Sequence, residues 1–171
     1  MWDSSGSLNN WDEPASLNTY LNSEYLSTIS INKDKMLFHT WSIGDITQNN
    51  NDLSDQIKAE NGTLSKNAIV GLITVSEYLR GNSNIQQCGN FNINNKNATI
   101  CLKTNWLADL QNLSWTISPV FNSESLVFGI NDGNIVTNCL NPVHVFPSLY
   151  LSSNTTLLGT GTEQDPYVIT N

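Results

Sequence analysis

The sequence predicts a small α+β domain with long loops, and three observations lead to that fold class. Residues 11–27 carry apolar side chains at helical spacing. Residues 37–43 and 113–118 alternate bulky and β-favouring residues, which is typical of strands. The Asn-Asp-Gly tripeptide at 131–133 supplies the positive φ angles that a tight hairpin turn needs between two apolar runs.

Composition limits the size of the protein and its partners. A chain of 171 residues, 39% of them hydrophobic, predicts one domain over 1–171 with a core of its own. Only 13% of the residues are charged and the net charge is -8, so no basic surface is expected for nucleic acid or anionic lipid. No run of 18 apolar residues occurs, so this segment is not expected to contact a membrane. The 26 asparagines favour turns and loops.

The first half of the chain predicts a helix followed by a strand. The helix over 11–27 places Leu17, Tyr20, Leu21 and Tyr25 on one face, which we expect in the core. The strand over 37–43 then places His39 and Trp41 on one face, because side chains alternate along a strand. Residues 44–67 are polar and predict a long surface excursion with one short helix near 54–60.

A strand and a second short helix are expected next. The apolar run over 68–73 has the length of a strand. Thr74 and Glu77 have the spacing of a capping box that opens a helix directly after it. Capping is a sufficient role for Glu77, and no catalytic role is expected of it. Residues 80–104 are too polar to bury a core, so they predict a loop before a short helix capped by Thr104.

Strands follow to the end of the chain. The strand over 113–118 directs Trp115 and Ile117 inward, and a hairpin joins the apolar runs on either side of the Asn-Asp-Gly turn. Pro147 interrupts a further strand over 143–151 and indicates an edge or a bulge. A turn over 159–165 leads into a closing strand at 166–169.

The three cysteines leave one without a partner. Cys88 and Cys101 bracket twelve Asn-rich residues, and a disulfide between them would stabilise the fold by roughly 3 kcal/mol. Cys139 lies among alternating apolar residues and is expected as a buried free thiol. Three reduced thiols in a cytosolic protein are the alternative. No metal site is expected, since no C-x-x-C pair occurs and His39 and His144 are isolated.

An ordered series of short motifs runs through the chain. It consists of Tyr-Leu-Asn at 20–22, Val-Gly-Leu-Ile-Thr-Val-Ser-Glu-Tyr at 70–78, Asn-Trp-Leu at 105–107, Ser-Trp-Thr-Ile-Ser-Pro at 114–119, Leu-Tyr-Leu-Ser-Ser-Asn at 149–154 and Gly-Thr-Gly-Thr at 159–162 with Asp-Pro-Tyr-Val-Ile at 165–169. The series resembles the C-terminal globular domain of uncharacterised surface proteins of low-GC bacteria, many of which carry a prepilin-type N-terminal segment. That family is distantly similar to C-type-lectin-like and formylglycine-generating-enzyme-like domains.

The resemblance implies an irregular C-type-lectin-like fold with two peripheral helices, a twisted antiparallel sheet and one side of long loops. It also implies an extracellular or cell-surface location, with this chain as the soluble part of a longer anchored or pilin-like protein that does not start at Met1. Pilus or surface-assembly subunits are then the expected partners. Phe146 stands where the family commonly has Arg, so a salt bridge or anion contact made by that Arg is not expected here.

The chemistry of the sequence favours a non-enzymatic function without a cofactor. No G-x-S-x-G, H-E-x-x-H or phosphate-binding glycine motif occurs, and no pair of acidic residues stands out as a glycosidase pair. We expect the globular head of a pilin-like or adhesive protein. The alternative is a lectin-like domain that recognises glycan or protein through loops at 81–103, 119–125 and 138–146.

Exposed aromatic side chains beside amides and carboxylates would favour the lectin-like alternative, because sugars stack on such rings. Phe121 and Phe146 are expected to be exposed, and Trp115 is expected to be buried.

Overall fold

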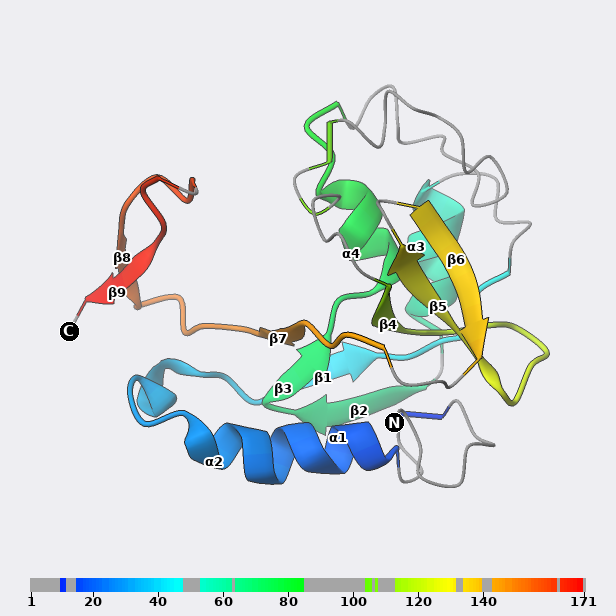
Figure 1. Cartoon of the computed structure of the whole chain (residues 1–171), viewed down its shortest axis with the longest axis horizontal. Coiled ribbons are helices and arrows are strands. Elements are labelled where there is room, and N and C mark those ends of the chain that lie inside the picture. Colours follow the sequence, from blue (N-terminus) through cyan, green and yellow to red (C-terminus); the bar gives the residue numbers. More distant parts are fainter. Residues whose placement is uncertain are drawn as a thin grey trace.

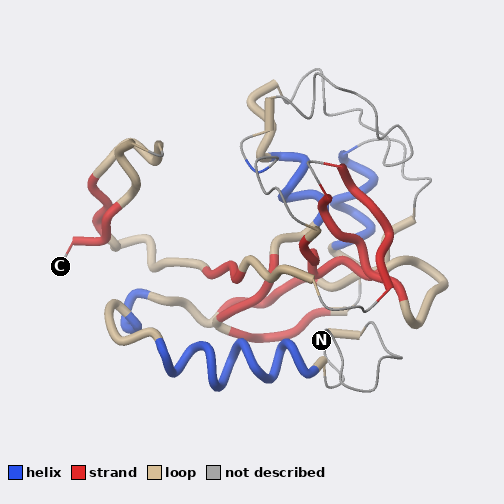
Figure 2. Tube along the Cα trace, viewed as in Figure 1, coloured by secondary structure: helices blue, strands red, loops and turns tan. Residues whose placement is uncertain are grey.

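The computed structural model confirms a mixed α+β domain with short helices and small antiparallel sheets (Figure 1). It describes residues 10–11, 15–47, 53–62, 64–84, 104–105, 107, 113–131, 134–139, 143–162 and 164–170. Instead of one twisted sheet, the strands of this part form four small sheets, which Figure 2 shows in red. The predicted Cys88–Cys101 bridge, the side chain of Cys139 and most of the helix expected after Thr104 lie outside the described residues. No described helix is long and apolar enough to cross a membrane.

The predicted first helix is confirmed, and it begins at Ser16. It consists of α1 (Ser16–Tyr20), the π-helical η1 (Leu21–Tyr25) and α2 (Leu26–Thr28) in direct succession. Leu17 and Leu21 are buried in the core, and Tyr25 packs against it. The prediction was wrong for Tyr20, which is exposed because it lies at the margin of the apolar stripe. A 3-10 turn, η2 (Lys33–Lys35), follows.

The region over 44–67 is less exposed than predicted. It contains the expected short helix as α3 (Leu53–Glu60), and also β2 (Ser65–Ala68), which pairs antiparallel with β1 (His39–Ser42). Ile46 and Leu53 are buried, so the predicted surface excursion is wrong for these residues, although many of the polar residues around them are exposed. These apolar residues are too widely spaced to show a period in the sequence, and their neighbours come from other parts of the chain.

The apolar run over 68–73 is split at Ile69. β3 (Val70–Leu72) leaves the β1–β2 pair and pairs antiparallel with β7 (Pro147–Leu149), so the strand predicted over 143–151 is confined to three residues. Pro147 is the first residue of β7, a position that tolerates the missing N–H.

The side chain of Asn22, in the π-helical segment, fills this strand break. Its Oδ1 accepts hydrogen bonds from the N–H groups of Ile69 and Val70 at 3.1 and 2.9 Å. Its Nδ2 donates to the carbonyl of Val70 at 2.8 Å. The amide therefore acts as a short additional strand, and it joins the first helix to the sheet.

The predicted capping box is confirmed at the start of α4 (Val75–Arg80). Thr74 Oγ1 accepts from the N–H of Glu77 at 3.0 Å, and the Glu77 carboxylate accepts from the N–H of Thr74 at 2.7 Å. Strand β3 thus passes into α4 through a closed local hydrogen-bond pair.

The predicted hairpin is confirmed as β5 (Leu126–Asn131) and β6 (Asn134–Cys139), and β5 also pairs antiparallel with β4 (Ser114–Pro119). All six residues of β4 are buried. The face that carries Trp115 and Ile117 is therefore covered, and so is the opposite face, which carries serine and threonine side chains. Two apolar clusters contribute to this core. One contains Trp115 and Ile117 with residues of the first helix, and the other contains Phe128 and Ile130 with residues of α3 and α4.

The predicted closing strand is confirmed as β9 (Val168–Thr170), and it forms a hairpin with β8 (Thr156–Leu158), a strand that the sequence did not predict. In Figure 1 this hairpin stands apart from the other elements, at the end of the extended segment that follows β7.

Replacing Asn22 by Ala should destabilise the domain by about 3 kcal/mol, because three backbone polar groups at the strand break lose their partner. Chemical denaturation of both proteins measures this difference. Asn67→Ala is the matched control, since it removes one exposed hydrogen bond to Thr40 and should change stability by less than about 0.5 kcal/mol. Equal effects of the two substitutions would show that Asn22 does not anchor the sheet.

Candidate functional site

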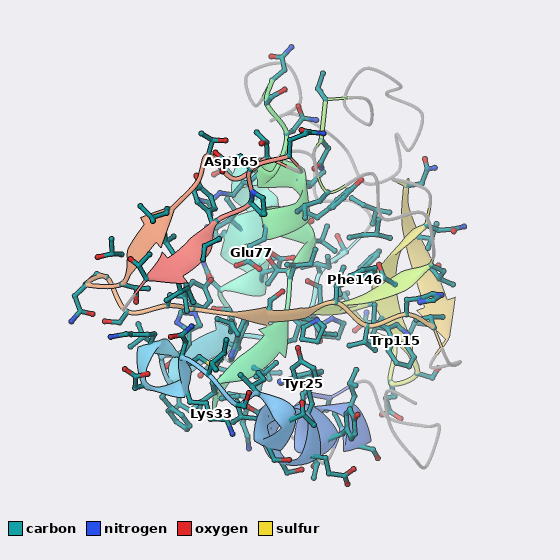
Figure 3. All side chains as sticks on the ribbon, turned by 60° about the vertical axis from the view of Figure 1, so that its left-hand side comes forward. Tyr25, Lys33, Glu77, Trp115, Phe146 and Asp165 are labelled. Atoms are coloured by element: carbon teal, nitrogen blue, oxygen red, sulfur yellow. The ribbon has the colours of Figure 1, made fainter. Side chains whose placement is uncertain are left out.

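The candidate site is a hollow of about 290 Å³ that we name the β1–α4 hollow. Strand β1, the end of α3, the start of α4 and Tyr150 surround it. Figure 3 labels Glu77 on α4, close to the β7 segment that leads to Tyr150. Four parts of the chain that are distant in sequence therefore meet at one opening.

Three aromatic rings form one wall of the hollow. The rings of His39 and Tyr150 are stacked, with centroids 3.7 Å apart and an interplanar angle of 25°. Trp41 meets both rings edge-on at 5.2 and 5.4 Å. The confirmed placement of His39 and Trp41 on one face of β1 makes this cluster possible.

Trp41 is buried and supports the other two rings. Its Nε1 donates to the carbonyl of Ala68 at 3.2 Å, and its ring lies directly against Gly71, where an added Cβ would come within 2.6 Å of it. Glycine is needed at this position because the indole occupies the space of a side chain. Tyr150 remains 38% exposed, so it offers the accessible ring of the cluster.

Polar groups surround the exposed ring. The phenol of Tyr150 donates to Glu77 Oε1 at 2.9 Å, while the other oxygen of Glu77 serves the capping box. Burial, the hydrogen bond to Glu77 and the charge of Glu77 raise the pKa of Tyr150 to about 12, and the nearby Arg80 opposes this rise. Arg80 is exposed at the end of α4, and Asn61 is exposed at the end of α3. The rim therefore offers a carboxylate, a guanidinium and an amide beside an aromatic face.

The buried carboxylate of Glu60 closes the base of the hollow. Its Oε1 accepts from Ser118 Oγ at 2.8 Å and from Gln56 Nε2 at 3.3 Å, and both oxygens accept from the N–H of Ser76 at 3.2 Å. Burial raises the pKa of Glu60, and the hydrogen bonds from Ser76, Ser118 and Gln56 oppose that shift. Glu60 thus joins the end of α3 to the start of α4 and to β4.

Sequence reasoning found some of these residues and missed others. The cap role of Glu77 is confirmed, and the structure adds its contact with Tyr150. Tyr150 and Glu60 were not singled out because most of their partners are distant in the chain. Tyr150 lies 73 positions from Glu77, and Glu60 lies 16 positions from Ser76 and 58 from Ser118. A glutamate at the end of a short helix was the only local signal for Glu60.

The aromatic residues proposed earlier lie elsewhere. Phe121 and Phe146 are exposed and Trp115 is buried, as predicted, but none of the three lines the hollow. Of the predicted recognition loops, 85–103 and 140–142 lie outside the described residues. Within the part of the chain that the structure describes, no three His, Cys, Asp or Glu side chains are grouped to hold a metal ion.

Replacing Glu60 by Gln should change the pH dependence of stability. A carboxyl whose pKa is raised by folding stabilises the fold while it is protonated, and this contribution falls as the pH rises from its ordinary value of 4.5 towards the folded value. Glutamine has no proton to lose, so the stability of Glu60→Gln lacks this contribution. The unfolding free energy of the wild type minus that of the variant should therefore decrease as the pH is raised from 4 to 7. Urea denaturation at each pH measures it. A difference that grows with pH would mean that the hydrogen bonds outweigh burial.

Replacing Glu77 by Gln should lower the pKa of Tyr150 from about 12 towards its ordinary value of 10, because the variant loses the anion next to the phenol. Gln retains the capping box. Carbon-13 NMR of tyrosine labelled at Cζ follows the titration. Tyr78 is the internal control, since burial alone raises its pKa to about 12 and it should not move. An unchanged Tyr150 would contradict the contact.

Comparisons of the chain with protein-family models, with curated proteins and with solved structures give no match.

Proposed function

We propose that this chain is a non-enzymatic module of a bacterial surface protein and that it binds a glycan in the β1–α4 hollow. It serves as the adhesive head of a longer, anchored or pilin-like protein, and its fold is a variant of the C-type-lectin-like domain. The observation that carries the proposal is the exposed ring of Tyr150, stacked on His39 and next to the carboxylate of Glu77.

A saccharide fits this combination of groups. The apolar face of a sugar ring packs on an aromatic side chain, while its hydroxyl groups need both donors and acceptors. Glu77 accepts, Arg80 donates, and Asn61 can do both. The hollow of about 290 Å³ has room for one or two sugar units, with the rest of a chain outside.

The two carboxylates in the hollow support binding over catalysis. Glycoside hydrolysis uses one carboxyl as an acid and a second as a base or nucleophile, on either side of the bond that breaks. Glu60 is held beneath α4 by its hydrogen bonds, and both oxygens of Glu77 are engaged. Each carboxylate therefore has a structural task at the position it occupies.

The resemblance to bacterial surface proteins supports the location. Glu77 and Tyr150 come from two of the motifs that carry it, at 70–78 and 149–154, and they contact each other in the β1–α4 hollow. Asn22, from the motif at 20–22, holds the break between β2 and β3. The low charge and the many asparagines suit a loop-rich extracellular surface.

Tyr150→Ala should weaken binding of a glycan, identified first on a glycan array, by about two- to tenfold, because one aromatic stacking contact is worth about 0.5–1.5 kcal/mol. Titration calorimetry measures the affinity. Tyr150→Phe keeps the ring and loses the bond to Glu77, so it should lose less. Tyr167→Ala, an exposed tyrosine of the C-terminal hairpin, is the matched control and should bind as the wild type does.

A silent array would contradict the proposal. Full incorporation of the chain into a surface filament, together with that silence, would instead favour a purely structural head.

A further inference from the structure

The C-terminal hairpin carries exposed apolar side chains and stands apart from the other described elements (Figure 1). Leu158 and Val168 form a cross-strand pair on one face of the hairpin, and Leu157 and Ile169 form the pair on the other. Leu157, Leu158 and Val168 are exposed, and the hairpin stands apart from the body in Figure 1. An isolated two-stranded hairpin is marginally stable in water, so an apolar partner surface would stabilise it.

Hydrogen bonds to Asp165 fix the turn of this hairpin. The carbonyl of Asp165 accepts from the N–H groups of residues 160–162, and its carboxylate accepts from the N–H of Thr160 at 2.9 Å. Gly161 has a φ of 74°, and its position lies under the ring of Tyr167. The hairpin therefore presents its leucines and the charge of Asp165 on a fixed frame.

A second apolar surface lies between the first helix on one side and residues 33–38 and β2 on the other, and we name it the helix groove. It consists of two adjoining hollows of about 250 and 270 Å³ that share Leu26 and Ile69. Met36 lines the first hollow, and Phe38, which is 70% exposed, lines the second. None of its lining residues belongs to the β1–α4 hollow.

Charge distinguishes the helix groove from most of the surface. The chain has 7 basic and 15 acidic residues, so two copies repel each other over most orientations. Lys33 lines one half of the groove and Lys66 lines the other. Asp165 lies in the turn of the hairpin, so these two surfaces have opposite charges beside apolar side chains that need cover.

We propose that the C-terminal hairpin of one copy docks in the helix groove of a second copy. Leu158 and Val168 pack on Leu26, Ile69 and Phe38, and Asp165 faces the lysines. The two surfaces are different, so the contact is heterologous and each copy keeps one free hairpin and one free groove. Repetition of the contact produces an open row of copies. Glycan binding is not required for it, because the β1–α4 hollow shares no residue with either surface.

Sedimentation velocity on the 171-residue chain tests this contact. The protein concentration is varied from about 10 µM to about 1 mM, because an interface below the standard size dissociates in this range. The sedimentation coefficient of the wild type should rise with concentration. Leu158→Asn removes the hairpin contact and Phe38→Asn removes the groove contact. Both side chains are at least 60% exposed, and both substitutions keep the net charge, so the fold and the charge repulsion should stay the same. Each variant alone should sediment as a monomer.

The equimolar mixture of the two variants is the decisive sample. The intact hairpin of Phe38→Asn should dock in the intact groove of Leu158→Asn, so the mixture should reach the size of a dimer and grow no further. Phe121→Asn changes an exposed phenylalanine elsewhere and should associate as the wild type does. A monomeric wild type, a mixture that stays monomeric, or self-association of Phe38→Asn alone would each overturn the proposal, the last by showing that hairpins pair with one another.

Discussion

The β1–α4 hollow depends on the buried carboxylate of Glu60. It binds the N–H of Ser76 and the hydroxyl of Ser118, and it therefore fixes α4 against both α3 and β4. A carboxylate is costly to bury unless donors surround it, and here several donors do. The positions of Glu77 and Arg80 follow from this contact, because both residues belong to α4.

A second buried polar contact supports the aromatic wall. Asn22 holds the break between β2 and β3, and the backbone then runs beneath the indole of Trp41 at Gly71. Trp41 in turn supports the stacked rings of His39 and Tyr150. The exposed ring is thus the outermost part of a series of contacts that begins in the core, and a rigid ring of this kind is well suited to stacking on a ligand.

The two proposed surfaces of the molecule have different physical foundations. The β1–α4 hollow is built from elements that long-range hydrogen bonds hold in place. The C-terminal hairpin relies on its own turn, and its apolar residues stay exposed. With such an arrangement, the proposed ligand and the proposed neighbouring copies would bind at two different places.

The sequence alone determined the local features of this protein: the first helix, the capping box of α4, the β5–β6 hairpin and the closing turn. Each depends on residues a few positions apart, so propensity and spacing suffice to predict it. The tertiary structure decided the split at Ile69, the burial of Ile46 and Leu53, and the assembly of His39, Glu77 and Tyr150. Asn22 bonds to Val70 across a separation of 48 residues, and Glu77 bonds to Tyr150 across a separation of 73 residues. No periodic pattern encodes contacts at such distances, because they arise only when separate elements pack together.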